Sequence, residues 1–243
     1  MDSPSFPPRR VGILGGMGPA AAIDLQLRVL ALDTAAREED HVPVLVWNVP
    51  QVPDRVAAIL GTGASPLPAM LAGARALEAA GAEAIAIACN TAHHWAAELA
   101  AGLRVPLLHI ADAAIAALER RTPRPGTVGL MGTRGTLASG FYARRLERRG
   151  FAWIAPGEAG QREVDAAIAA VKSADRSAAA RHFRAAAEGL RGHGAGTFLL
   201  ACTELPLAAP GSGFEADCLD ANLALAEAIV AWSRGGATPR AGA

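Results

Sequence analysis

A strand-like run of residues that ends in a cysteine occurs twice in this chain and constrains its fold more than any other feature. The first copy is Ala82–His94 (AEAIAIACNTAHH), with the cysteine at Cys89, and the second is Gly196–Leu205 (GTFLLACTEL), with the cysteine at Cys202. In both copies small and β-branched apolar residues form a run of strand length, and amide or hydroxyl side chains open the next turn. Such runs are typical of strands that are buried on both faces of a parallel sheet.

The segments that precede the two cysteine strands repeat as well. Val11–Leu14 leads into Gly15–Pro19, and Val128–Met131 leads into a similar glycine turn, so both predict a strand, a tight turn and a helix. From the start of this segment to the cysteine the spacing is 78 residues in the first half and 74 in the second. We therefore predict duplicated, pseudo-symmetric α/β halves whose two cysteines face one pocket. The first domain is expected to comprise residues 1–113 and 214–243, the latter as a returning helix, and the second domain residues 114–213.

Composition agrees with helices packed on parallel sheets and argues against several classes of function. Apolar residues make up 51% of the chain and aromatic residues only 5%, which disfavours a β-sandwich. The formal net charge is zero and no basic stripe occurs, so we predict no nucleic-acid partner. No apolar run approaches the roughly 18 residues of a membrane-spanning helix, so we predict no membrane partner. Three cysteines in 243 residues form no disulfide framework, which favours free thiols and a cytoplasmic location.

The carboxyl ends of the predicted strands form the candidate binding rim, because ligands of open parallel α/β sheets bind there. This rule places both cysteines at one rim with the Gly15–Gly18 turn and the proline-fixed loop Gln51–Arg55. Met17 and Gln51, in those two loops, are therefore predicted to bind substrate. A helix is expected to begin after each cysteine, and its N–H groups and dipole stabilise a thiolate. At least one cysteine is accordingly expected to have a pKa below the ordinary thiol value of about 8.5.

Polar residues flank both cysteines in the sequence. Asn90, Thr91 and Thr203 are good capping residues and could equally donate hydrogen bonds to a substrate carboxylate. His93 and His94 follow at helical spacing, and the alternatives are donors behind the site or a capping or core histidine. Cys89 with a following histidine could also form a nucleophile dyad or half a metal site, but no CxxC or HxxxH spacing predicts a metal.

Two cations are candidates for binding a carboxylate. Arg55 lies in the loop at the predicted rim, where carboxylate binding and a plain surface position are both open. Lys172 is the only lysine in the chain and lies in Val164–Leu190, which predicts one or two amphipathic helices. A solvated lysine is usual there. Lys172 is also the only residue that could carry a pyridoxal phosphate aldimine.

Two cysteines on opposite sides of one carbon suit the inversion of a stereocentre next to a carboxylate. A thiolate removes the α-proton, and a thiol on the other face returns one. Donors aimed at the enolate-like charge and exclusion of water must offset the weak acidity of the α-carbon. A single strand-terminal cysteine is more often a small buried residue, but two at matching positions favour catalysis. Cys218 has no counterpart in the other half and is interpreted as structural.

The sequence resembles the aspartate/glutamate racemase family, within the cofactor-independent, two-cysteine racemases. The matching segments are GILGGMGP (12–19), DHVP (40–43), NVPQVPDR (48–55), GTGASPLP (61–68), CNTAH (89–93), VPLLHIADA (105–113), MGTRGT (131–136) and CTELPL (202–207). The resemblance implies two Rossmann-like domains with parallel sheets and the active site in the cleft between them, a homodimer, and neither metal nor pyridoxal phosphate. It further implies that Cys89 and Cys202 are the acid/base pair and that Arg55 and Lys172 recognise substrate carboxylates. Asn90, Thr91 and Thr203 then surround the α-carboxylate.

Departures from the family pattern leave the substrate and the exact reaction open. Ala20 and Ala22 stand where the family often has Glu and Thr, and Ala88 replaces a common proline. The sequence therefore predicts an amino-acid racemase, most simply for aspartate or glutamate. A broad-specificity amino-acid racemase and a dicarboxylate isomerase or decarboxylase of the same superfamily are the alternatives. A dinucleotide site at Gly16–Ala21 fits the GxGxxA pattern, but the acidic residues Glu38–Asp40 precede the second strand rather than end it.

Overall fold

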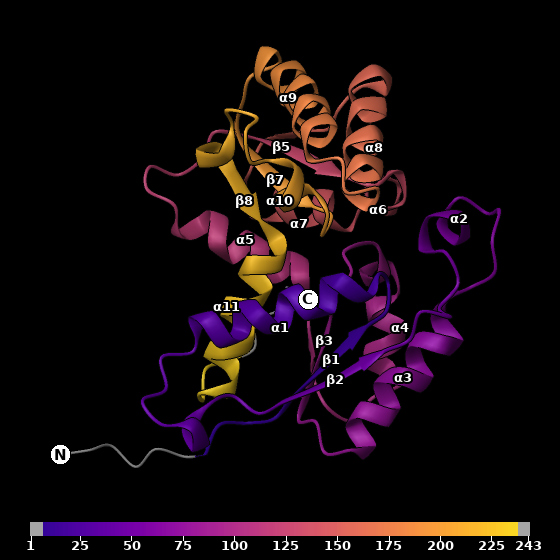
Figure 1. Cartoon of the computed structure of the whole chain (residues 1–243), viewed down its shortest axis with the longest axis vertical. Helices are drawn as coiled ribbons and strands as arrows, with labels where there is room; N and C mark the ends of the chain where they lie inside the picture. The colour runs from indigo at the N-terminus through magenta and orange to yellow at the C-terminus, as the bar shows by residue number, and fades with distance from the viewer. Residues whose placement is uncertain (1–6, 238–243) are drawn as a thin grey trace. The chain divides into compact units, whose positions relative to one another are not determined.

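The computed structural model describes residues 7–237 and divides them into two α/β units (Figure 1). Unit 1 takes the described residues up to Asp54, Ala64–Ala113 and those from Asn222 onward. Unit 2 takes Arg55–Gly63 and Ala114–Ala221. The predicted division had kept residues 55–63 in the first domain and placed the return to it at residue 214. Each unit is described below by itself.

The sheet of unit 1 has four parallel strands in the order β2-β1-β3-β4. These are β1 (Val11–Gly15), β2 (Val44–Asn48), β3 (Ala84–Ile87) and β4 (Leu107–Leu108). Gly15 pairs with Asn48 on one side of β1, and Leu14 pairs with Ile87 on the other. The first three strands therefore end at one edge of the sheet, and the residues that follow them emerge there together.

Helices cover both faces of this sheet. They are α1 (Pro19–Leu32), α3 (Leu67–Ala79), α4 (Ala96–Ala101), the start of α5 (Ile110–Arg120) and α11 (Ala221–Ser233), with short 3-10 turns η1 (Glu38–Asp40) and η2 (Thr91–Trp95). In Figure 1, α1 and α11 lie on one side of the strands and α3 and α4 on the other. The alternation of side chains along a strand explains this arrangement. A Cβ on Gly12 would lie 3.1 Å from Leu77 of α3, whereas one on Gly15 would meet Ala22 of α1.

The C-terminal helix α11 is fastened to unit 1 at both of its ends. Asn222 Nδ2 donates to Asp24 Oδ2 of α1 at 2.7 Å, and Ser233 Oγ donates to the Arg9 carbonyl at 2.6 Å. The Arg9 guanidinium also lies over the Trp232 ring. These contacts bring residues more than 190 positions apart into one core.

The sheet of unit 2 repeats the same topology, with four parallel strands in the order β6-β5-β7-β8. These are β5 (Thr127–Gly132), β6 (Trp153–Ile154), β7 (Ala195–Ala201) and β8 (Cys218–Asp220). Gly132 pairs with Ala201, and Leu200 pairs with Asp220. The strand order relative to the chain is the same as in unit 1, so the prediction of two α/β halves with parallel sheets is confirmed.

Two long helices of unit 2, α8 (Glu158–Lys172) and α9 (Arg176–Gly192), pack side by side (Figure 1). Val164 and Ile168 of α8 join Phe183 and Leu190 of α9 in a core cluster with Phe198 of β7. The chain breaks between the two helices at Asp175, whose Oδ1 caps α9 by accepting from Ala178 N at 2.9 Å. The remaining helices are α2 (Arg55–Ile59), α6 (Arg134–Ser139), α7 (Phe141–Arg148), α10 (Leu205–Ala208) and the 3-10 turn η3 (Glu215–Asp217).

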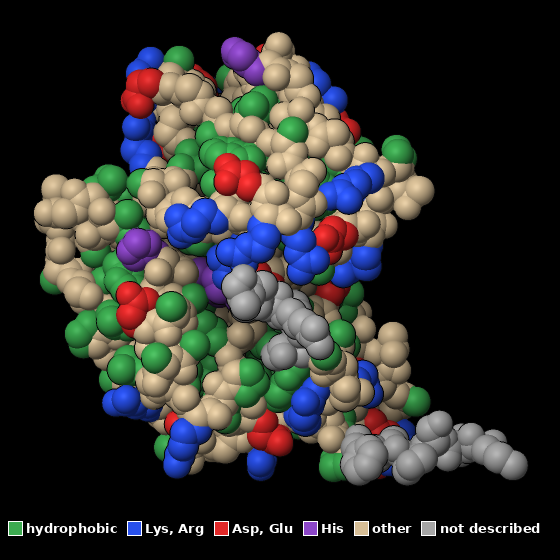
Figure 2. Space-filling view, turned by 180° about the vertical axis from the view of Figure 1, so that it is seen from behind, with side chains coloured by type: hydrophobic (Ala, Val, Ile, Leu, Met, Phe, Trp, Pro, Cys, Tyr) green, Lys and Arg blue, Asp and Glu red, His purple; other side chains and the backbone are tan. Residues whose placement is uncertain are grey.

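The surface carries charges of both signs. Figure 2 shows acidic and basic side chains together with apolar ones on the face it draws. No helix within residues 7–237 is long and apolar enough to cross a membrane.

Candidate active site

Cys89 lies two residues beyond the end of β3, at the carboxyl edge of the unit 1 sheet. The side chain is buried, with 6% of the residue exposed, and its neighbours Asn90 and Thr91 are buried too. The chain continues into the 3-10 turn η2, which runs without a break into α4, so a helical segment begins after Cys89.

The ring of His93 holds the turn after Cys89 in place. Nδ1 lies 2.8 Å from the Cys89 carbonyl oxygen, and the Ile110 N–H donates to Nε2 at 3.2 Å. Because a carbonyl can only accept and an amide N–H can only donate, these partners fix a neutral ring with its proton on Nδ1. His93 is therefore the core histidine of the predicted pair, while His94 is exposed.

The glycine turn after β1 lies at the same edge of unit 1. Gly16 has φ of 96°, and a Cβ there would come closer than 3.0 Å to the backbone of Val49. Val49 N donates to the Gly15 carbonyl at 3.1 Å, which joins the loop after β1 to the loop after β2. The structure thus places Met17, which is buried, and Gln51, which is exposed, in two linked loops beyond the strand ends, as the sequence predicted for this unit.

Cys202 occupies the matching place in unit 2, directly after β7, and is also 6% exposed. Its Sγ donates to Glu204 Oε2 at 3.0 Å, and Thr203 Oγ1 donates to the same oxygen at 3.0 Å. Lys172 Nζ lies 3.8 Å from the other carboxylate oxygen. Cys202, Thr203 and Lys172, which the sequence predicted as site residues, therefore all contact the carboxylate of Glu204. The sequence analysis had not predicted Glu204 as a site residue. The available signal was the acidic residue two positions after the cysteine in CTEL.

The predicted site residues divide between the two units. Those of unit 1 are Met17, Gln51, Cys89, Asn90 and Thr91, and those of unit 2 are Arg55, Lys172, Cys202 and Thr203. Arg55 is the first residue of α2 and is half-buried, although the prolines before it had predicted a loop. Its short helix packs against α6, which explains why residues 55–63 belong to unit 2.

A second polar cluster lies at the carboxyl end of β5. Arg134 forms paired hydrogen bonds of 2.9 Å with the two oxygens of Glu158, and its Nε donates to Asp165 Oδ2 at 2.7 Å. These carboxylates raise the pKa of Arg134 above its ordinary value, and Arg134 in turn lowers the pKa of Glu158. Gln161 Nε2 donates to the Gly132 carbonyl at 3.0 Å, tying α8 to the strand end. These hydrogen bonds hold the MGTRGT segment (residues 131–136) against α8. None of the predicted site residues takes part in them.

Cys218 belongs to the structural framework of unit 2. Its Sγ donates to the Phe214 carbonyl at 3.2 Å. Burial raises the pKa of this thiol to about 12, and the nearby Asp217 carboxylate adds to the effect. Cys218 is therefore a neutral thiol at physiological pH, in agreement with its structural interpretation.

Two other histidines are paired with carboxylates. His41 Nδ1 lies 3.0 Å from Asp33 Oδ2, and His182 Nδ1 lies 2.7 Å from Glu163 Oε2. In the part of the chain that the structure describes, no three His, Cys, Asp or Glu side chains cluster closely enough to hold a metal ion.

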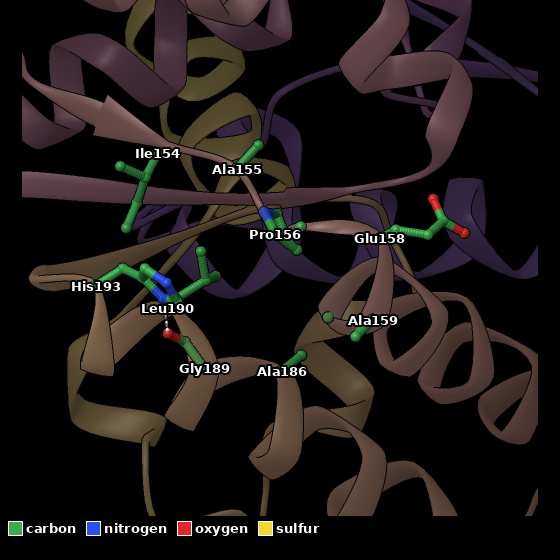
Figure 3. Close-up of a pocket in the computed structure, with 11 residues that line it drawn as sticks. Ile154, Ala155, Pro156, Glu158, Ala159, Ala186, Gly189, Leu190 and His193 are labelled. Atoms are coloured by element: carbon green, nitrogen blue, oxygen red, sulfur yellow. Dashed lines mark hydrogen bonds between the residues drawn. The ribbon is translucent and has the colours of Figure 1, made fainter.

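A pocket of about 460 Å³ lies in unit 2 between the β6–α8 loop and the C-terminal half of α9 (Figure 3). Ile154 and Pro156 line it on one side, and Leu190 and His193 on the other. His193 Nδ1 is bonded to the Gly189 carbonyl at 2.7 Å, and the Glu158 side chain points away from these residues. The lining includes none of the predicted site residues, so this pocket is separate from the Cys202 turn.

Comparison with known proteins places this architecture in a family. The model of the family described as "Asp/Glu/Hydantoin racemase" matches residues 14–229. The broad specificity amino-acid racemase RacX of Bacillus subtilis (strain 168) is 30% identical over 169 residues, which are 67% of this chain and 70% of RacX. The structure of Picrophilus torridus aspartate racemase is similar, with a TM-score of 0.81 and 30% identity over 93% of this chain and 94% of that one. A Pyrococcus horikoshii aspartate racemase homologue, at 21% identity and a TM-score of 0.74, covers 93% of this chain and 99% of its own and shares the fold. The chain belongs to the Asp/Glu/hydantoin racemase family.

Proposed function

We propose that this chain is a cofactor-independent racemase of aspartate or glutamate that works by two cysteine acid/base groups, Cys89 and Cys202. The observation that carries the proposal is the equivalent place of the two cysteines. Each follows the strand that pairs beside the first strand of its unit, and each is buried next to hydroxyl or amide side chains. A pair of thiols at matching sheet edges supports two-base chemistry better than a structural role for both.

In the proposed reaction one cysteine, as a thiolate, takes the α-proton, and the other, as a thiol, delivers its proton to the opposite face of the carbon. The electron pair of the broken C–H bond passes into the α-carboxylate and returns to form the new C–H bond. Racemisation leaves the two cysteines with their protonation states exchanged, so the enzyme is ready for the other enantiomer. Positioned acid/base groups contribute about 10²–10⁴-fold to such a reaction.

We assign substrate binding to the polar residues beside the cysteines and to the loops at the sheet edges. Asn90, Thr91 and Thr203 donate to the α-carboxylate, which stabilises the negative charge that grows there. Met17 and Gln51 line the site from the loops of unit 1. Arg55 and Lys172 supply positive charge for a second, side-chain carboxylate, which is the basis for choosing aspartate or glutamate. We propose that the active site lies in the cleft between the carboxyl edges of the two sheets of one chain. We also propose that the chain forms a homodimer.

A second candidate function is broad-specificity amino-acid racemisation. It is favoured by the 30% identity to RacX, whose name carries that activity. It is also favoured by Lys172, whose side chain is 64% exposed and already faces the carboxylate of Glu204. Under this alternative Arg55 and Lys172 do not select a second carboxylate, and neutral amino acids are turned over as fast as acidic ones.

Incubation of the purified full chain with a panel of L- and D-amino acids in deuterated water tests both candidates. Chiral chromatography follows inversion, and NMR follows the loss of the α-proton. We expect the D-isomers of aspartate or glutamate to appear with deuterium at Cα, and expect Cys89→Ala and Cys202→Ala to lower turnover by about 10²–10⁴-fold. Equal rates for acidic and neutral amino acids would select the broad-specificity alternative.

Cys218→Ala is the matched control, because it removes a thiol of unit 2 that takes no part in the proposed reaction. It is expected to keep the turnover of the parent. Absence of exchange and inversion for every amino acid, with consumption of maleate or an arylmalonate instead, would contradict the proposal and select the isomerase or decarboxylase. Light scattering of the same preparation tests the predicted homodimer.

A further inference from the structure

The carboxylate of Glu204 joins the second cysteine to the only lysine of the chain. Oε2 accepts from Cys202 Sγ and from Thr203 Oγ1, each at 3.0 Å, while Oε1 lies 3.8 Å from Lys172 Nζ. The carboxylate is well shielded, with 19% of its side chain exposed. Each of its two oxygens therefore has a different neighbour, a thiol on one side and an ammonium on the other.

From this geometry we infer that Glu204 is a positioning residue that keeps Cys202 protonated at rest, so that Cys202 is the resting acid and Cys89 the resting base. The inference rests on the proposed two-cysteine function. An S–H group donates to the carboxylate and is stabilised by it, whereas a thiolate at the same place is repelled by the negative charge. The hydrogen bond also fixes the direction in which Sγ points.

Charges around Glu204 determine how strong this bias is. Lys172, at the end of α8, reduces the negative charge that Cys202 experiences. Arg176, at the start of α9, donates from Nη1 to the Leu207 carbonyl of α10 at 3.1 Å and adds positive charge to the same segment. Cys202 then loses its proton most readily when Lys172 lies close to Glu204. A substrate carboxylate that draws Lys172 away would strengthen the hold of Glu204 on the thiol proton.

Cys89 is buried in unit 1, where the described contact is made by its backbone. Its backbone carbonyl accepts from His93 Nδ1. The His93 ring is neutral, because its Nε2 accepts a hydrogen bond from the Ile110 N–H. Among the titratable groups of this part of unit 1, Glu83 and Glu98 are exposed, and the buried His109 has its ring centroid 4.7 Å from that of His93. The sequence alone left open which cysteine rests as the thiolate, and the contact of Cys202 with Glu204 is the observation from which we assign the proton to Cys202.

Titration of the full chain labelled with ¹³C at cysteine Cβ tests the inference without requiring a reagent to reach the buried thiols. Cys→Ala variants assign the three resonances. We expect Cys202 to ionise at a higher pH than Cys89 in the parent. Glu204→Gln, which keeps a hydrogen-bond partner of the same size, should lower the Cys202 midpoint by about one pH unit or more and leave Cys89 in place. Lys172→Met should shift the Cys202 midpoint upward.

Glu188→Gln is the matched control, because it removes one negative charge from the exposed face of α9 in the same unit. It is expected to move none of the midpoints. A Cys202 midpoint that is unchanged or raised in Glu204→Gln, or one that lies below that of Cys89 in the parent, would overturn the inference. The readout does not depend on turnover: a protein that racemises without the shift refutes this inference alone, and one that shows the shift without racemising refutes only the proposed function.

Discussion

The ring of His93 bridges the Cys89 carbonyl oxygen, 2.8 Å from Nδ1, and the Ile110 amide, 3.2 Å from Nε2. One buried side chain thereby connects the turn after β3 with the start of α5, 17 residues further along the chain. Its two backbone partners are a pure acceptor and a pure donor, so only one neutral tautomer satisfies both. A proton added to Nε2 would break the bond from Ile110. The position of Cys89 therefore depends on a neutral His93.

Substitution of His93 by alanine is expected to destabilise the fold by about 1–3 kcal/mol, because a buried carbonyl and a buried N–H both lose a partner. Turnover should fall as well, since the Cys89 turn is no longer held. Urea unfolding of His93→Ala measures the first effect. His94→Ala, one residue on and exposed, should stay within about 0.5 kcal/mol of the parent. Equal stability of the two variants would refute the bridging role.

Gly16 is expected to tolerate no side chain. Its φ of 96° disfavours any residue with a Cβ, and that Cβ would collide with the Val49 backbone rather than with a flexible side chain. We predict that Gly16→Ala lowers the free energy of unfolding by about 1–3 kcal/mol. Gly126→Ala is the control, because a Cβ there meets no atom within 4 Å. Urea midpoints of the two variants that coincide would show that the two loops are not clamped together at this point.

The sequence predicted the central strands and the position of each cysteine after the end of a strand, because those features are local. Apolar runs followed by glycine or cysteine define β1, β3, β5 and β7, and parallel strands must end at one edge. The short strand β8 (Cys218–Asp220) could not be predicted, because its three residues form a strand only by pairing with β7. Unit 2 therefore extends through this strand to Ala221, beyond the boundary expected at residue 213.

The side-chain contacts at the candidate site could not be predicted from the sequence either, because they depend on tertiary structure. Glu204 lies two positions after Cys202 in the sequence, but the contact of its carboxylate with Lys172, the last residue of α8, depends on the fold. His93 could be a catalytic donor or a core residue until Ile110 is placed against its ring. Arg55 follows two prolines that predict a loop, and only its packing against α6 makes it the start of a helix.

Cys218 supplies a prediction at alkaline pH. Burial raises the pKa of its thiol to about 12, from an ordinary value of 9.0. The folded state therefore keeps this proton between about pH 9 and pH 12, while the unfolded chain loses it. The stabilising effect of the neutral thiol is complete below pH 9 and is lost as the pH rises through this range. The free energy of unfolding of the parent should accordingly fall relative to that of Cys218→Ala when both are followed by urea unfolding from neutral to alkaline pH. A constant difference between them would refute the assignment.

Asp33 supplies the corresponding prediction at acid pH. Its side chain is 1% exposed, and burial alone would raise its pKa, but hydrogen bonds from Arg234, the Val42 N–H and His41 outweigh burial and hold the pKa below the ordinary value. A carboxyl with a lowered pKa stabilises the fold above the pKa of the unfolded chain, about 3.9. That stabilisation is lost as the pH falls through the lower, folded-state pKa.

Asp33→Asn removes the charge that joins the end of α1 to the residues after α11, and should destabilise the fold at pH 7 by about 1–3 kcal/mol. Below pH 4 the parent should lose stability faster than the variant, so that the difference in their free energies of unfolding narrows with acid. Urea unfolding at a series of pH values gives both curves. Glu39→Gln, a change at an exposed ion pair with Arg37, should reproduce the acid profile of the parent. A difference in the free energy of unfolding between Asp33→Asn and the parent that stays constant down to low pH would contradict this prediction. It would mean that the negative charge of Asp33 does not stabilise the contact between the end of α1 and Arg234.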